Sequence, residues 1–172
     1  LVEIPVDVCP EEVPEPLNYR ATFGTRTAPD PQAVTEVARV LVEASRPVIY
    51  AGQGVHYARA WQPLRELAEL LEAPVTTSLG GKSAFPEDHP LSLHVTGMHG
   101  TEAANYAIIN TDVLIAVGCR FSDRITGDTK SFQEGKKIIH IDIDPSEIGK
   151  NVAVEIPVVG DARIALSELT KI

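Results

Sequence analysis

The stretch VLIAVG (residues 113–118) is an apolar run closed by a glycine, and this pattern decides the fold class. A short apolar run bounded by a turn residue is typical of a strand that is buried on both faces of a parallel sheet. The stretch PVIYAG (47–52) has the same form, and VTTSL (75–79) precedes another glycine. The three stretches predict parallel strands that end at glycines.

Helical patterns separate these strands along the chain. Asp30 is a favourable N-cap, Pro31 suits the first helical position, and apolar residues recur at helical spacing over 34–41. The other predicted elements are helices over 61–71 and 101–110, strands over 137–144 and 154–159, and a last helix that Gly160-Asp161 opens and that ends at Leu169. Residues 82–98 are predicted to form a long loop, a kind of segment that is usually functional.

This alternation predicts an α/β fold with a doubly wound, Rossmann-like parallel sheet over residues 30–172. Residues 1–29 are interpreted as the end of a preceding domain, in which 1–8 alternate like a strand, followed by a linker. The linker contains prolines at several positions, which exclude a helix or an inner strand. The chain begins with Leu rather than Met, so we expect it to be a piece of a longer protein.

The composition excludes several functional classes. Fifteen Lys and Arg against 24 Asp and Glu give a net charge of −9, so no basic face for nucleic acid is expected. No apolar run approaches the ~20 residues that span a membrane, and no signal peptide is recognisable at LVEIPVDV. Cys9 and Cys119 are expected to be free thiols in a reducing, cytoplasmic setting.

The candidate site follows from the ends of the predicted strands, because ligands of open parallel sheets bind at their carboxyl edge. For each glycine alone a turn is the better explanation, but glycines at four of the five ends together favour a close approach of the backbone to a ligand. The ends read GQGVH (52–56), SLGGK (78–82), GCRFSDR (118–124), DID (142–144) and GDA (160–162).

Charged residues at two of these ends suit a nucleotide. Arg120 and Arg124 are suited to bind a phosphate or pyrophosphate, with a surface ion pair to Asp123 or Asp128 as the alternative. His140, Asp142 and Asp144 alternate with isoleucines, so the polar face of this strand needs a partner. The carboxylate at the tip could accept hydrogen bonds from ribose hydroxyls, whereas Asp144 is better explained as a helix N-cap.

Other kinds of site are disfavoured. The pair Gly52 and Gly54 lacks the third glycine of the dinucleotide fingerprint, and no acid ends the second strand, which argues against NAD. His94 and His99 have no third ligand at a spacing typical of zinc, so no metal site is predicted. Lys82 could contact an anion but is more simply solvated, and no triad-like spacing predicts catalytic residues in this chain.

Several longer stretches resemble one family. HVTGMHGTEAANYAIINTDVLIAVGCRFSDRITGD (94–128) and KKIIHIDIDPSEIGKNVAVEIPVVGDARIAL (136–166) resemble the middle domain of acetolactate synthase, also called acetohydroxyacid synthase. This is the thiamine-diphosphate-dependent transferase of branched-chain amino acid biosynthesis. RPVIYAGQGV (46–55) and PVTTSLGGKSAFPEDHPLSL (74–93) resemble the same family.

The resemblance implies a six-stranded parallel domain that holds FAD in an extended conformation without net redox chemistry. It places Gly52, Gln53, Gly54, Arg120, Asp123 and Arg124 around the ribityl-pyrophosphate, and Gly118 is expected among the cofactor-binding residues. It places Ser78, Leu79, Gly97, Met98 and His99 toward the ribityl chain and the isoalloxazine, and Asp142, Ile143, Gly160 and Asp161 around the adenosine.

The resemblance also implies what this chain leaves to other parts of such an enzyme. The activating glutamate of the N-terminal domain and the GDG…N motif of the C-terminal domain, which holds thiamine diphosphate through Mg²⁺, are absent from the sequence. We therefore expect these two domains as partners in a homo-oligomeric parent, and no carboligation by this chain alone.

The sequence departs from the family's pattern at three places. GQG, SLGG and RFSDR stand where the family commonly has GGG, TLMG and RFDDR. A middle domain of another thiamine-diphosphate lyase or decarboxylase, with ADP or nothing in its cleft, is the alternative.

Overall fold

The computed structural model describes residues 3, 5–13, 15–16, 19–20 and 24–172, and it contains a six-stranded, all-parallel sheet. The strand order is β3-β2-β1-β4-β5-β6, so the order reverses between β1 and β4. The strands are β1 (Pro47–Ala51), β2 (Val75–Thr77), β3 (Ser92–Val95), β4 (Val113–Val117), β5 (Lys137–Asp142) and β6 (Ile156–Val159). The predicted doubly wound α/β fold is confirmed.

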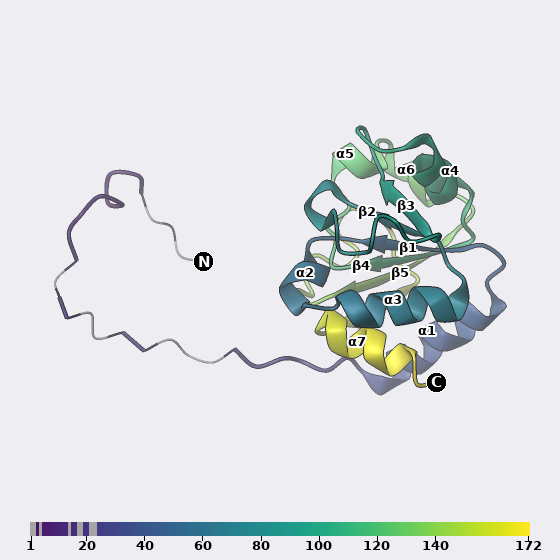
Figure 1. Cartoon of the computed structure of the whole chain (residues 1–172), viewed down its shortest axis with the longest axis horizontal. Helices are drawn as coiled ribbons and strands as arrows, with labels where there is room; N and C mark the ends of the chain where they lie inside the picture. Colours follow the sequence, from purple (N-terminus) through teal and green to yellow (C-terminus); the bar gives the residue numbers. More distant parts are fainter. Residues whose placement is uncertain (1–2, 4, 14, 17–18, 21–23) are drawn as a thin grey trace.

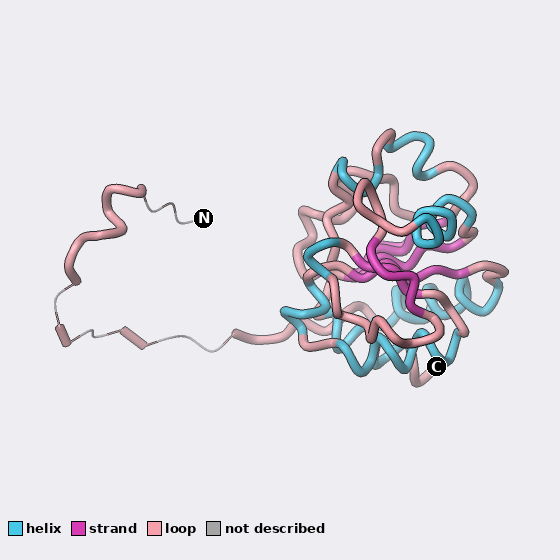
Figure 2. Tube along the Cα trace, turned by 45° about the horizontal axis from the view of Figure 1, so that its top comes forward, coloured by secondary structure: helices cyan, strands magenta, loops and turns pink. Residues whose placement is uncertain are grey.

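Helices cover both faces of this sheet, as Figures 1 and 2 show from two directions. One face packs against α1 (Pro31–Glu43), α2 (Gly54–Ala58), α3 (Trp61–Leu71) and α7 (Ala162–Leu169). The other face packs against α4 (Glu102–Asn110), α5 (Asp123–Thr126) and α6 (Thr129–Gln133), and a short 3-10 helix, η1 (Leu79–Gly81), follows β2.

The two faces form because neighbouring strand residues point in opposite directions. In β4, Leu114 belongs to the cluster beneath α4 and α6, whereas Val113 and Ile115 belong to the cluster beneath α1, α3 and α7. All of β4 is buried, which is the pattern that the apolar run predicted.

Side-chain caps fix where the predicted helices begin. The Asp30 carboxylate accepts a hydrogen bond from Gln32 N at 2.8 Å, and Pro31 is the first residue of α1. The Asp161 carboxylate accepts from Arg163 N and Ile164 N at the start of α7. These caps satisfy amide groups that the first turn of a helix leaves free.

Some predicted boundaries and one loop are wrong. Residues 92–95, predicted as loop, form the edge strand β3, which pairs only with β2. SLHV is too short and too polar to be predicted as a strand from its own pattern. It forms a strand because it pairs with β2. The second strand ends at Thr77 rather than at 79, β5 ends at Asp142 rather than at 144, and β6 begins at Ile156.

Asp144 also differs from its prediction as a helix N-cap. Residues 145–149 form turns and no helix, and the Asp144 carboxylate accepts hydrogen bonds from Ser146 N at 2.9 Å and from Ser146 Oγ at 2.7 Å. This is a local turn made by an aspartate side chain, a conformation that competes with helix initiation.

The segment before α1 reaches the body of the molecule at one point. Thr27 O accepts a hydrogen bond from Asp161 N at 2.8 Å, and Arg26 Nε lies 3.7 Å from the Asp161 carboxylate. The described residues before Gly24 lie apart from the sheet and its helices (Figure 1). Residues 6–10 form turns rather than a strand, while 1, 2, 4, 14, 17, 18 and 21–23 lie outside the described residues.

Candidate functional site

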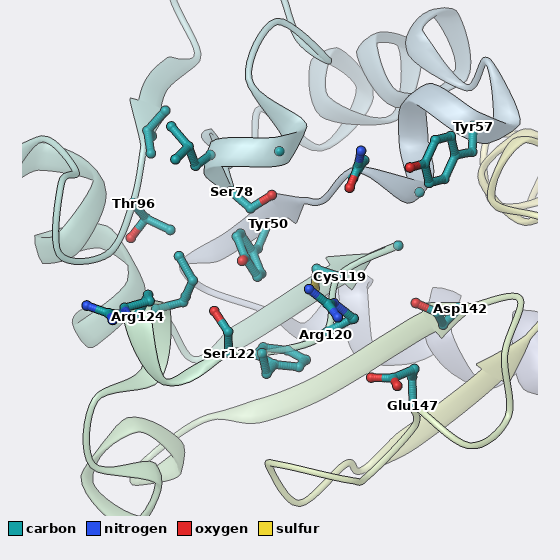
Figure 3. Close-up of a pocket in the computed structure, with 18 of the residues that line it drawn as sticks. Tyr50, Tyr57, Ser78, Thr96, Cys119, Arg120, Ser122, Arg124, Asp142 and Glu147 are labelled. Atoms are coloured by element: carbon teal, nitrogen blue, oxygen red, sulfur yellow. The ribbon is translucent and has the colours of Figure 1, made fainter. Parts of the chain in front are cut away.

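A cleft of about 760 Å³ lies at the carboxyl ends of the strands, where the order of the sheet reverses. This is the edge at which open parallel sheets bind ligands, and the volume is within the usual ~300–1,000 Å³ of ligand sites. Figure 3 shows that Thr96 and Arg124 lie at one end and Tyr57, Asp142 and Glu147 at the other. Tyr50, Ser78, Arg120 and Ser122 lie between these ends.

The floor of the cleft depends on glycines that pack against each other. A Cβ on Gly54 would lie 2.6 Å from Gly118 Cα, and Gly118 has φ +58, a conformation that favours glycine. A Cβ on Gly52 would lie 2.1 Å from Gly118 O. These glycines bring the turn after β1 against the end of β4, so the close approach that they permit is between two backbone segments.

The two arginines face the cleft from different positions. Arg120 precedes α5, and no carboxylate of the described residues pairs with it. Arg124 lies within α5, where its guanidinium reaches the Met98 sulfur at 3.9 Å and the Asp123 carboxylate at 4.0 Å. The Arg124–Asp123 pair is exposed and at the limit of an ion pair, so Arg124 is open to a ligand anion.

The opposite end of the cleft is acidic. Asp142 is nearly buried at the tip of β5, where one carboxylate oxygen accepts from Asp144 N at 3.0 Å. Its other oxygen lies 3.9 Å from His140 Nε2 and receives no hydrogen bond within the described part of the chain. Glu147 also lines this end and is paired with Lys150 at 2.8 Å. A ligand hydroxyl or N–H would supply the donor that Asp142 lacks.

His140 lies on the polar face of β5, and the Cys119 carbonyl is the partner that this face was predicted to need. Its Nε2 lies 2.8 Å from Cys119 O and must donate, because a carbonyl only accepts. The ring is buried, which lowers the pKa of His140, and Nδ1 has no partner among the described residues. Burial, together with the nearby Asp142 charge, raises the pKa of the Cys119 thiol well above its usual range. Cys119 is a free, buried thiol, and Cys9 is free and exposed.

Asn105 positions the segment that carries Met98 and His99. Its side-chain oxygen accepts hydrogen bonds from Thr96 Oγ1 and Gly97 N, both at 2.8 Å, and its amide nitrogen donates to Gly97 O at 3.1 Å. Met98 N donates to Arg124 O at 2.9 Å. Asn105 of α4 and Arg124 of α5 thereby hold this segment in place as one wall of the cleft.

Most of the residues expected at the site lie together in the cleft. They are Gln53, Gly54, Ser78, Leu79, Met98, His99, Gly118, Arg120, Arg124, Asp142 and Ile143. Asp161 lines a smaller hollow beside the cleft but is already engaged as the cap of α7. Gly52, Gly97, Asp123 and Gly160 line neither space, and a Cβ on Gly160 would meet Pro29 N at 2.8 Å.

Sequence reasoning missed the aromatic and hydroxyl residues of the cleft. Tyr50, Tyr57, Thr96, Phe121 and Ser122 line it. Thr96 falls within the stretch that was interpreted as a loop, and Tyr57 follows GQGVH by one position. A rule that included the first helical turn after each strand end would have found Tyr57.

The walls of the cleft expose apolar side chains beside its charges. Leu79 is 69% exposed, Met98 57% and Ile143 56%. Such residues around a few charged groups are what a ligand with both rings and phosphates requires. Within the described residues, no group of three metal-ligating side chains occurs and no helix is long and apolar enough to cross a bilayer.

Comparison with known proteins assigns the family. Residues 34–169 match the family described as "Thiamine pyrophosphate enzyme, central domain". The chain belongs to this family. The predicted resemblance to acetolactate synthase is confirmed as well, because the chain is similar to proteins described as acetolactate synthase large subunits. It is 54% identical to one from Methanocaldococcus jannaschii over 86% of the chain and 25% of that protein. It is 47% identical to one from Methanococcus aeolicus over 98% of the chain and 28% of that protein.

Two solved structures share this fold. An enzyme from Mycobacterium smegmatis, described as thiamin diphosphate-dependent, superposes with a TM-score of 0.74 at 33% identity, over 88% of this chain and 29% of that one. Benzoylformate decarboxylase from Polynucleobacter necessarius gives 0.73 at 28% identity, over 97% of this chain and 31% of that one. The chain therefore spans less than a third of the proteins it resembles, and it is an acetolactate-synthase-like central domain.

Proposed function

We propose that this central domain binds FAD in its cleft and serves as the nucleotide-binding scaffold of an acetolactate-synthase-like enzyme. The observation that carries the proposal is the order of groups along the cleft. Arg124, with Met98 beside it, lies at one end, Arg120 lies in the middle, and the Asp142 carboxylate lies at the other end. A flavin, a pyrophosphate and an adenosine follow one another in FAD in the matching order.

The residues present fit such a ligand at three points. Leu79 and Met98 present exposed apolar surface for a flavin ring. Arg120 has no carboxylate partner among the described residues and is free to bind the pyrophosphate. The carboxylate oxygen of Asp142 that receives no hydrogen bond from the described chain suits a ribose hydroxyl. When bound, the flavin supplies ring surface rather than net electron transfer.

The parent enzyme would condense two pyruvates, or pyruvate with 2-oxobutyrate, with loss of CO2. Thiamine diphosphate and Mg²⁺ would be held by N- and C-terminal domains of a cytoplasmic homo-oligomer, and residues 30–172 would form the central domain between them. The similarity to acetolactate synthase large subunits supports this assignment. The 172-residue chain alone should form no acetolactate from pyruvate, thiamine diphosphate and Mg²⁺, because it lacks the activating glutamate and the diphosphate motif.

A second candidate is the middle domain of another thiamine-diphosphate lyase or decarboxylase whose cleft holds ADP or nothing. The similarity to benzoylformate decarboxylase favours it. In the first candidate a flavin ring occupies the end of the cleft beside Arg124, whereas in the second no flavin is bound.

Ligand-dependent thermal unfolding separates them. A ligand that binds only the folded chain raises its stability by an amount that grows with concentration. FAD should raise the Tm of the 172-residue chain more than ADP does at equal concentration, and the purified chain should carry flavin absorbance. Equal shifts with FAD and ADP would favour the second candidate, and no shift with either at millimolar concentration would overturn the nucleotide site.

A further inference from the structure

A smaller hollow of about 180 Å³ adjoins the acidic end of the cleft. It lies among α2, the tip of β5 and the start of α7, and it shares Tyr57, Asp142 and Ile143 with the cleft. Its volume is below the ~300–1,000 Å³ of sites that hold a whole ligand, so it suits one ring system at the end of a longer molecule.

Tyr57 is the aromatic side chain of this hollow. The residue is 77% exposed, and its ring lies at the end of the cleft where Asp142 lies (Figure 3). Within the described residues the ring packs against no other aromatic ring and its hydroxyl has no hydrogen-bond partner. A large apolar ring is therefore presented to solvent at the mouth of a binding space.

The helix that carries Tyr57 is held in place by its neighbours. His56 Nδ1 accepts a hydrogen bond from the Trp61 indole at 2.9 Å, and His56 Nε2 therefore donates to Lys82 O at 2.9 Å. At the start of α2, Gly54 N donates to Gly118 O at 3.0 Å. α2 is thus tied to α3, to the segment after η1 and to the end of β4, so the backbone that carries Tyr57 is in place before a ligand arrives.

The other lining of the hollow suits a heterocycle. Ile143 is 56% exposed and offers a second apolar surface. The Asp142 carboxylate, which is nearly buried, offers an acceptor beside it. An aromatic ring, an aliphatic side chain and a carboxylate together recognise a flat, hydrogen-bonding ring system better than they recognise a bare sugar or a phosphate.

We propose that Tyr57 is a specificity-determining residue on which the base of the bound nucleotide stacks, in the hollow beside Asp142 and Ile143. The inference rests on the proposed nucleotide site and adds to it the residue that selects for a base. Every nucleobase has a π-face, so stacking on Tyr57 distinguishes a nucleotide from its sugar phosphate without reading one particular base.

Isothermal titration of the 172-residue chain with ADP, ribose 5-phosphate and inorganic pyrophosphate tests this inference. Tyr57→Ala should weaken ADP binding by roughly 5- to 150-fold, the range measured for loss of one base–aromatic stack. Its binding of ribose 5-phosphate and pyrophosphate should stay unchanged. Tyr57→Phe should bind ADP like the unmodified chain, because the ring rather than the hydroxyl makes the contact.

Tyr106→Ala is the matched control. Tyr106 is another exposed tyrosine (67%), on α4, and it lines neither the cleft nor the hollow, so its removal should leave the binding of all three ligands unchanged. The Tm of Tyr57→Ala without ligand should match that of Tyr106→Ala, which separates a lost contact from a folding defect.

Two results would overturn the inference while the nucleotide site stands. One is unchanged ADP binding by Tyr57→Ala, and the other is an equal loss of ADP and ribose 5-phosphate binding. If Arg120→Ala weakens ADP binding and Tyr57→Ala does not, the proposed function holds and the role of Tyr57 falls. If the unmodified chain binds no ADP at millimolar concentration, both fall together.

Discussion

Arg120 and Arg124 are four positions apart in the sequence, yet they lie at different places along the cleft. Arg120 comes before α5 and sits in the middle, whereas Arg124 is within α5 at the end beside Thr96 (Figure 3). Spacing alone predicted that both would bind one pyrophosphate. From their places along the cleft we expect a short ligand to reach Arg120 and a longer one to reach Arg124 as well.

The two arginines should therefore differ in which nucleotide they affect. Loss of a charge-assisted contact typically costs about 1.5–3 kcal/mol, which is roughly ten- to a hundredfold in affinity. Arg120→Ala should weaken both ADP and FAD binding by about this factor, and Arg124→Ala should weaken FAD binding more than ADP binding. Arg39→Ala, on the exposed side of α1 and away from the cleft, is the control in the same titrations. Equal effects of both variants on ADP would mean that the pyrophosphate lies between the two guanidiniums.

His140 shows how one buried residue makes stability depend on pH. Burial lowers the pKa of His140 in the folded chain, so the unfolded chain, with a pKa of about 6.5, binds the proton first. The stability that neutral His140 contributes is complete above about pH 6.5 and is lost as the pH falls below that value. The loss proceeds by up to about 1.4 kcal/mol per pH unit until the folded-state pKa is reached.

His140→Gln should flatten this dependence. Glutamine does not titrate and keeps a donor for Cys119 O. The free energy of unfolding of His140→Gln should therefore fall less between about pH 6.5 and 5 than that of the unmodified chain. Urea unfolding at several pH values measures the difference. His99→Gln, at an exposed histidine, should retain the original slope. Parallel profiles for His140→Gln and the unmodified chain would show that another group is responsible.

Among the secondary-structure elements, the buried ones could be predicted from the sequence and the edge of the sheet could not. β1 and β4 are continuous apolar runs because both of their faces are covered, and such runs are visible without a structure. β3 is a strand because it pairs with Val75, Thr76 and Thr77 of β2, which are distant from it in the sequence. Thr76 Oγ1, for example, donates to His94 O at 2.9 Å.

The same division applies to the candidate site. Residues directly after strands, such as Gln53, Ser78 and Arg120, could be predicted because the carboxyl ends of parallel strands share one edge. Asn105 and Tyr57 could not, because their roles depend on how α4 and α2 pack. Gly160, which was expected near the ligand, lines neither the cleft nor the smaller hollow, and a Cβ there would meet Pro29 N at 2.8 Å.

The contact between the β1–α2 turn and the end of β4 should be sensitive to a single methyl group. Gly118→Ala would strain the backbone, because Gly118 has a left-handed conformation, and it would also place a Cβ 2.5 Å from Gly54 Cα. Gly135→Ala would add only the strain, about 1–2 kcal/mol, because Gly135 has φ +73 and open space around it. Gly118→Ala should cost about 1–3 kcal/mol more, the usual penalty of overpacking, in urea unfolding at pH 7. Equal losses would show that the two backbone segments can move apart freely.

Across the whole molecule, the body is attached to its N-terminal segment at Arg26 and Thr27. The hydrogen bond from Asp161 N to Thr27 O and the Arg26–Asp161 pair hold the segment against the start of α7. Arg20 is exposed and forms no ion pair among the described residues. The two arginines therefore differ in their contacts with the body of the molecule.

Limited trypsin digestion should cut after Arg20 before it cuts after Arg26. Proteolysis favours exposed segments without backbone hydrogen bonds, so the stable product should retain Thr27 and everything from Asp30 onward. Mass spectrometry of the early fragments identifies the first cut. An Asp161→Asn variant keeps the cap of α7 but weakens the pair with Arg26, and should expose the bond after Arg26 sooner. A first cut within 110–160 would contradict the domain boundary at Asp30.

The chain enters the body beside the first residue of α7, and it leaves the body at the last. α7 spans eight residues, which at 1.5 Å per residue separates the two points by about 12 Å. Figure 1 shows both on the same side of the molecule. A unit whose two junctions are this close can be spliced into a surface loop of an unrelated host with only a few connecting residues on each side. Circular permutants that join the two points should therefore still fold.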